Sequence, residues 1–154
     1  MKIYILLFSL FIIGFSSCKK DAATFDPIKQ AAADDATIQA YIAANSITAV
    51  KDPSGLYYQV VTEGTGDFPT AKSRVTVNYS GKLVNGTVFD SANGYTQTLS
   101  TLIKGWQIGL PHIKTGGRII LLVPSALGYG TSSTSGIPAN SVLIFTVDLT
   151  GFSN

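Results

Sequence analysis

The chain has 154 residues, of which 45% are hydrophobic and 13% are charged, and its formal net charge is +2. This length suits one domain with some sequence to spare, and the composition allows a buried core. No basic patch indicates a nucleic-acid partner, and no long run of like charges indicates a charged one. One cysteine and one histidine exclude an internal disulfide and a zinc site built from those ligands, so we expect no metal and no cofactor.

The first residues have the features of an export signal. An apolar run at residues 3–15 follows a basic start, and at about 13 residues it is too short for a bilayer, which takes about 20. Small residues then precede Cys18, as at a secretory cleavage site. The stretch from Phe15 to Cys18 resembles a bacterial lipobox, which implies a signal peptide at residues 1–17 and a lipid on Cys18.

The expected location is therefore the cell envelope, with the chain attached through that lipid to the outer membrane and facing the periplasm or the surface. The Lys19-Lys20-Asp21 stretch resembles lipoprotein surface signals, and it is equally typical of a solvated tether. An uncleaved N-terminal anchor is the alternative to lipidation.

Residues 18–33 are predicted to be the tether, and residues 34–50 to carry a short amphipathic helix from Asp34 to Asn45. Asp34 or Asp35 can cap its first turn. The apolar side chains that fall on one face are Ile38, Tyr41 and Ile42. This helix could pack on the main domain or pair with a second copy, and we expect packing.

After a turn at residues 52–55, the pattern becomes typical of strands. Alternation and β-branched residues predict strands at 56–61, 74–81, 82–84, 87–89, 117–124 and 141–152. Asn85-Gly86 predicts a hairpin turn in which both residues adopt positive φ. A Gly-rich segment at residues 105–110, closed by Pro111, allows one or two helical turns. The fold class is α+β, with about five antiparallel strands and one short helix.

Several short motifs follow one another in a fixed order. They are Val77-Asn78-Tyr79-Ser80-Gly81, Gly86-Thr87-Val88-Phe89-Asp90-Ser91, Leu102-Ile103-Lys104-Gly105-Trp106, Val123-Pro124, Leu127-Gly128-Tyr129-Gly130, Ile137-Pro138 and Leu143-Ile144-Phe145. In this order the chain resembles the FKBP family of peptidyl-prolyl cis–trans isomerases over residues 55–152. The resemblance implies a half-barrel sheet wrapped around the short helix, with a proline pocket between them.

The resemblance also implies a role for each pocket residue. Trp106 would be the floor, Ile103 N–H and the Tyr129 hydroxyl would bind substrate carbonyls, and Asp90 would lie at the polar edge. The apolar lining would comprise Tyr79, Phe89, Phe145, Leu102, Ile103 and Ile137, with Tyr95 as a stand-in aromatic from the loop at residues 91–101. Without the resemblance, aromatics at alternate strand positions are more often core residues, and Asp90 could simply cap a turn.

The implied activity is peptidyl-prolyl isomerisation of proline-containing unfolded or nascent exported polypeptides. Rotation of an X–Pro bond forms no bond to the enzyme, which agrees with a sequence that has no phosphate loop and no nucleophile elbow. A non-catalytic chaperone or peptide-binding module and a scaffold lipoprotein are the alternatives. Macrolide inhibitors are implied ligands, although the 91–101 segment is short and lacks the basic residue that pairs with the aspartate in the best-known small members.

Overall fold

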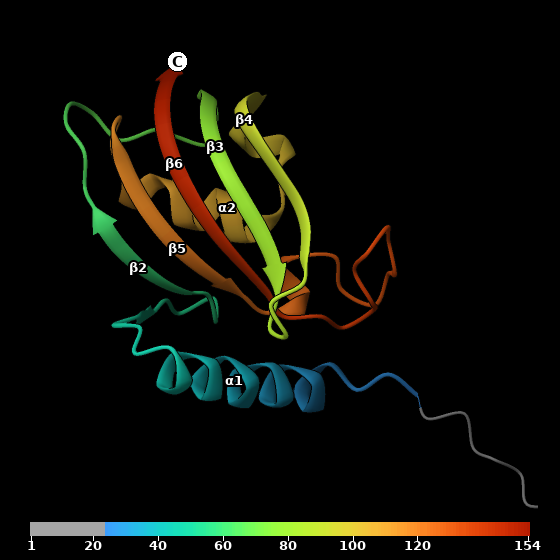
Figure 1. Cartoon of the computed structure of the whole chain (residues 1–154). Coiled ribbons are helices and arrows are strands. Elements are labelled where there is room, and N and C mark those ends of the chain that lie inside the picture. Colours follow the sequence, from blue (N-terminus) through green and yellow to red (C-terminus); the bar gives the residue numbers. More distant parts are fainter. Residues whose placement is uncertain (1–23) are drawn as a thin grey trace, which may run out of the picture.

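The computed structural model in Figure 1 describes residues 24–154. The signal peptide expected at residues 1–17 and the lipid site expected at Cys18 lie outside the described residues. Among the helices that are described, none is both long enough and apolar enough to cross a membrane.

Within the described part of the chain, six strands form one antiparallel sheet in the order β1-β2-β5-β6-β3-β4. The strands are β1 (Val50–Lys51), β2 (Tyr57–Thr62), β3 (Arg74–Leu83), β4 (Val88–Thr98), β5 (Gly117–Val123) and β6 (Leu143–Ser153). Figure 1 shows the short helix α2 (Lys104–Gly109) lying across the face of this curved sheet. The predicted α+β fold of about five antiparallel strands around one short helix is confirmed, and the additional strand is the two-residue β1.

The helix α2 packs so close to β5 that only glycine fits at two of its positions. A Cβ atom on Gly105 would lie 2.6 Å from Val123 Cγ1, and one on Gly109 would lie 2.4 Å from Leu121 Cδ2. Both contacts are far shorter than van der Waals distance. The two glycines therefore let the backbone of α2 approach the sheet, and this approach sets how deeply Trp106, which lies between them, enters the core.

The hairpin between β3 and β4 forms at the predicted Asn85-Gly86 turn, but the prediction that both residues adopt positive φ is wrong. Gly86 has a φ of +89°, and Asn85 is not among the residues with positive φ. The Asn85 side-chain oxygen instead accepts a hydrogen bond from the Thr87 N–H at 3.0 Å. Gly86 N–H donates to the Leu83 carbonyl at 2.9 Å, and Leu83 N–H donates to the Thr87 carbonyl at 2.9 Å. This pattern is a type I turn followed by a glycine bulge, so only the second residue requires glycine.

The segment at residues 91–98, expected as a loop, is the continuation of β4. Val77 pairs with Tyr95 and Tyr79 with Ala92, so β4 holds one extra residue at this point. Gly94 lies in that bulge with a φ of +68°. A bulge resets the two-residue alternation of a strand. It therefore brings Tyr95 to the same face as Asp90, although five positions separate them.

The N-terminal helix α1 (Pro27–Ala44) is longer than predicted. It begins at Pro27 rather than near Asp34, and its cap is Asp26, whose carboxylate accepts hydrogen bonds from Ile28 N–H (3.0 Å) and Lys29 N–H (3.2 Å). Residues 27–33, expected to be tether, are therefore helical. The sequence does carry a helix start signal at this point, since an aspartate precedes a proline. The prediction began the helix too late because the alanines that follow show no apolar periodicity.

The helix α1 packs on the domain, as expected. Ile38 is fully buried and belongs to a second apolar cluster, separate from the core around α2, with Tyr57, Leu122, Val142 and Ile144. Figure 1 shows α1 running across one end of the sheet. The described chain is thus one folded unit from α1 to β6.

Candidate active site

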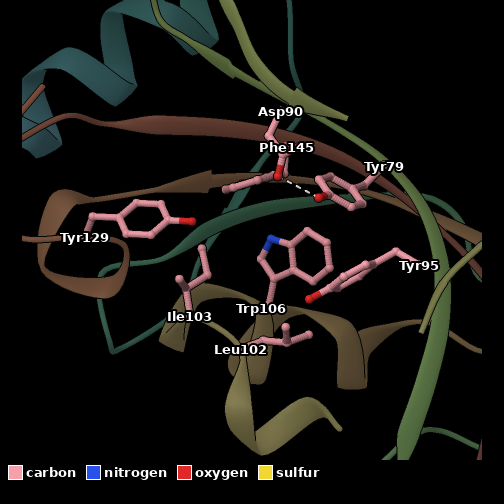
Figure 2. A pocket seen from close by; sticks show the side chains of 8 residues that line it. All are labelled: Tyr79, Asp90, Tyr95, Leu102, Ile103, Trp106, Tyr129 and Phe145. Carbon is pink, nitrogen blue, oxygen red and sulfur yellow. Dashed lines mark hydrogen bonds between the residues drawn. The ribbon is translucent and has the colours of Figure 1, made fainter. Parts of the chain in front are cut away.

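An open cavity lies between α2, the β3–β4 hairpin and the loop before β6. Its volume is about 390 Å³, counting space that opens to solvent. Figure 2 shows the side chains that line it: Tyr79, Asp90, Tyr95, Leu102, Ile103, Trp106, Tyr129 and Phe145. A small, mostly apolar cavity with a few convergent polar groups is the usual form of a binding site.

Trp106 forms the base of this cavity. The side chain is only 4% exposed, and Tyr79 and Phe145 pack edge-on against it, with ring centroids 5.1 and 5.4 Å from the Trp106 ring and interplanar angles of 83° and 88°. The indole is nevertheless not sealed in the core, because it lines the cavity. Within residues 24–154, its buried N–H has no hydrogen-bond partner. A buried donor without a partner is costly, so the position of the indole carries an energetic penalty.

Two of the predicted lining residues, Phe89 and Ile137, are not among the side chains that line this cavity. Phe89 packs edge-on against Phe145, with ring centroids 5.6 Å apart, and Ile137 is buried in the core around α2. Gly81 makes this packing feasible, since a Cβ atom there would lie 2.7 Å from both the Phe145 and Phe89 rings. Sequence reasoning missed this role, although Gly81 stands inside a motif that it had singled out.

The polar edge consists of Asp90 and Tyr79. The Tyr79 hydroxyl donates a hydrogen bond to Asp90 Oδ2 at 2.6 Å. The sequence lacks an obvious basic partner for Asp90, and the ion pairs found among the described residues do not include it. The Tyr79 hydroxyl, rather than a cation, therefore restrains the Asp90 carboxylate.

Two of the three tyrosines that line the site, Tyr79 and Tyr129, have raised pKa values and stay protonated far above neutral pH. Burial raises the pKa of Tyr79 most, and the hydrogen bond to Asp90 and its negative charge raise it further. Burial also raises the pKa of Tyr129, followed by the charge of Asp90. Each tyrosine is therefore available as a hydrogen-bond donor at any physiological pH.

The Ile103 N–H and the Tyr129 hydroxyl are donors at the cavity that are available to a ligand. No hydrogen bond from the Ile103 N–H or from the Tyr129 hydroxyl is found in the part of the chain that the structure describes. Ile103 is the residue before α2, and its carbonyl accepts hydrogen bonds from the N–H groups of Trp106 (3.0 Å) and Gln107 (3.2 Å). The peptide unit that carries the Ile103 N–H contains the Leu102 carbonyl, which accepts a hydrogen bond from Gln107 Nε2 at 2.6 Å. The helix α2 therefore holds both peptide units of Ile103 in place at the cavity.

The comparison with known families decides what this cavity belongs to. The family model described as FKBP-type peptidyl-prolyl cis-trans isomerase matches residues 66–150, which is more than half of the chain. The chain belongs to the FKBP family. The predicted family and its fold are thereby confirmed.

Individual FKBP proteins agree with this assignment. The chain is 45% identical over 102 residues to FkpA from Escherichia coli (strain K12), covering 62% of this chain and 37% of FkpA. It is 46% identical over 101 residues to peptidyl-prolyl cis-trans isomerase Mip from Coxiella burnetii, covering 62% of this chain and 44% of Mip. The chain thus spans less than half the length of these two relatives.

Solved structures show the same likeness. The crystal structure of FkpA from Escherichia coli superposes with a TM-score of 0.72 and 36% identity, covering 82% of this chain and 62% of that one. A peptidyl-prolyl cis-trans isomerase from Pseudomonas syringae gives a TM-score of 0.70 with 27% identity, covering 85% of this chain and 99% of that one.

The donors in this FKBP site are hydroxyl and amide groups rather than metal ligands. Among residues 24–154, no three side chains of His, Cys, Asp or Glu come together as a metal site would require. Asp90 is the one carboxylate that lines the cavity, and it already accepts the Tyr79 hydroxyl. The geometry is suited to holding a neutral, partly apolar group in place.

Proposed function

We propose that the chain is a peptidyl-prolyl cis–trans isomerase that assists the folding of exported, proline-containing polypeptides. The observation that carries this proposal is the cavity floored by Trp106 and walled by Tyr79 and Phe145, with the Ile103 N–H and the Tyr129 hydroxyl as unused donors at its rim. Such a cavity can take a prolyl ring against the indole and fix the carbonyls on either side of the X–Pro bond.

The chemistry requires no reactive group. Rotation about the peptide bond faces a barrier of about 18–20 kcal/mol, which amide resonance causes. The planar amide carries more charge on its oxygen than the twisted amide, so a desolvated aromatic pocket disfavours the planar form more. The catalyst therefore lowers the barrier by binding the twisted amide better than either planar isomer.

In this proposal, each lining residue has a distinct role. Trp106 is the floor under the prolyl ring, the Ile103 N–H and the Tyr129 hydroxyl hold the flanking carbonyls, and Asp90 fixes the Tyr79 wall. The remaining wall residues are Phe145, Tyr95 and Leu102, with Phe89 and Ile137 supporting them. These roles agree with the positions in Figure 2, where Tyr129 and Ile103 lie on the opposite side of the indole from Tyr79 and Tyr95.

The test is a proline-peptide isomerisation assay on the full-length chain, purified in mild detergent. The unmodified chain should accelerate isomerisation well above the buffer rate. Tyr129→Phe should lower kcat/KM by about two- to tenfold, since one neutral hydrogen bond contributes about 0.5–1.5 kcal/mol. Trp106→Leu, which keeps an apolar group in the core, should lower it by about tenfold or more, as each 1.36 kcal/mol added to the barrier would.

Tyr41→Phe is the matched control, because it removes the same hydroxyl from α1, outside the cavity. It should leave kcat/KM unchanged. If the unmodified, folded chain does not exceed the buffer rate, the enzymatic proposal is wrong and a peptide-binding module is favoured instead.

We further propose that the chain is exported and anchored by a lipid on Cys18 in the cell envelope, at the outer membrane. The support is the sequence pattern alone, because Cys18 lies outside the described residues. Cells fed a labelled lipid precursor should incorporate label into the unmodified chain and not into Cys18→Ala. Equal labelling of both would contradict this anchor without touching the isomerase assignment.

A further inference from the structure

A buried carboxylate on α1 lies outside the catalytic cavity. Asp34 is only 3% exposed, and none of the ion pairs formed by the described residues includes it. It accepts three hydrogen bonds instead: from Ser125 N–H at 2.8 Å, from Ser125 Oγ at 2.6 Å and from Gln30 Nε2 at 2.7 Å. Burying a carboxylate is costly unless it is well hydrogen-bonded, so these contacts are what makes Asp34 tolerable here.

Ser125 uses all its polar atoms in organising one loop. It begins the short 3-10 helix η3 (Ser125–Leu127) after β5. Its N–H and hydroxyl are held by Asp34, and its carbonyl accepts hydrogen bonds from Gly128 N–H (3.0 Å) and Gly130 N–H (2.8 Å). The loop at residues 125–130 therefore closes on Ser125, and Ser125 is tied to α1.

Tyr129 lies between those two glycines. The residue is 41% exposed, and the aromatic ring pairs found among residues 24–154 do not include it. Its hydroxyl nevertheless lines the cavity opposite Tyr79 and Tyr95 (Figure 2). With little packing of its own, Tyr129 depends on the backbone of its loop for its position.

We propose that Asp34 is a positioning residue: through Ser125 it holds the loop that aims the Tyr129 hydroxyl at a substrate carbonyl. This rests on the proposed function, in which that hydroxyl binds the substrate. The helix α1 is then part of the working enzyme, because its Asp34 fixes the geometry of the pocket rim through Ser125.

Asp35 provides a matched comparison one residue away. Its carboxylate accepts hydrogen bonds from Lys51 Nζ at 2.6 Å and from the Tyr57 hydroxyl at 2.7 Å, so it docks the same helix to β1 and β2. It makes no contact with the Tyr129 loop among the hydrogen bonds of the described chain. A substitution there loosens α1 without releasing Ser125.

The test measures kcat and KM for a proline peptide on the full-length chain carrying Asp34→Ala, Asp34→Asn or Asp35→Ala. Asp34→Ala should lower kcat/KM by about three- to tenfold, because small misplacements of a substrate-binding group are costly in rate. Asp34→Asn should recover most of the loss, since its amide oxygen can accept both Ser125 hydrogen bonds. Asp35→Ala should lower the free energy of unfolding and leave kcat/KM within about twofold.

The same Asp34→Ala change in a Tyr129→Phe background shows whether the effect passes through the hydroxyl. No further loss beyond that of Tyr129→Phe is expected, because the group being positioned is already gone. The same fold-loss in both backgrounds, or a Tyr129→Phe variant with full activity, would overturn the proposal.

Amide hydrogen exchange of residues 125–130 gives a readout that needs no catalysis. Exchange there should quicken in Asp34→Ala and stay as in the unmodified chain in Asp35→Ala. Equal exchange in all three would overturn the proposal even in an active enzyme, whereas an inactive unmodified chain would refute only the proposed function. If Asp34→Ala fails to fold, Ser125→Ala, which keeps the backbone hydrogen bond, should show the same pattern to a smaller degree.

Discussion

Replacing Gly109 by alanine tests the close packing of α2 on β5. The added Cβ would lie 2.4 Å from Leu121 Cδ2, 3.1 Å from Cδ1 and 3.3 Å from Cγ. Leu121 is fully buried and cannot swing into solvent, so α2 itself must move outward. Overpacking of this kind costs about 1–3 kcal/mol, and alanine returns about 0.5–1 kcal/mol through its better helix propensity. The expected net loss of stability is therefore about 1–2 kcal/mol.

Urea unfolding followed by the fluorescence of Trp106, the only tryptophan, measures this loss. With a urea dependence of about 1–3 kcal/mol/M, the midpoint should fall by about 0.3–2 M. Activity should fall as well, because Trp106 moves with α2. The reasoning fails if the Gly109→Ala midpoint equals that of the unmodified chain.

Gly151→Ala is the control for the substitution itself. A Cβ at Gly151 would have no heavy atom within 4 Å, and the residue does not have a positive φ. The midpoint should therefore stay the same or rise slightly, since alanine restricts the unfolded chain. A fall as large as that of Gly109→Ala would show that glycine loss alone, rather than the Leu121 contact, lowers stability.

Two further predictions concern charge. Because the pKa of Tyr79 is raised in the folded state, its neutral phenol contributes stability in full below pH of about 10 and loses this contribution at higher pH. Asp90→Asn should lower this pKa, so an ultraviolet titration of the folded chain should show Tyr79 ionising at lower pH in the variant, and identical titration curves would contradict this. Arg118 holds the pKa of Asp148 below its usual range, so the pair contributes above pH of about 3.9 and loses its contribution as pH falls. Asp148→Asn should lower the free energy of unfolding by less than about 1 kcal/mol at pH 7, as expected for an exposed pair, and should not change it at pH 2. A difference in stability that persists at pH 2 would argue against the ion pair.

Local pattern determined much of this protein. Two-residue alternation predicted β3, the Asn85-Gly86 pair predicted the hairpin, and the Gly-rich segment closed by Pro111 predicted α2. These features depend on a few neighbouring residues, whose backbone preferences and spacing act over one turn or one strand. The order of the motifs then indicated the family, and eight of the ten residues expected around the pocket do line one cavity.

The remaining features depend on contacts between distant parts of the chain. The bulge at Gly94 brings Tyr95 to the face of Asp90, because the register of β4 against β3 overrides simple alternation. Asp34, expected at a helix start, is instead buried in mid-helix against Ser125. Local sequence could not indicate this contact, because the two residues are 91 positions apart. Of two aromatics that pack against each other beside Gly81, Phe145 lines the cavity and Phe89 is not among its lining residues. Local sequence determines which residues share a face of a strand or helix. Which residues each face contacts is determined only when the strands have paired and the helices have packed.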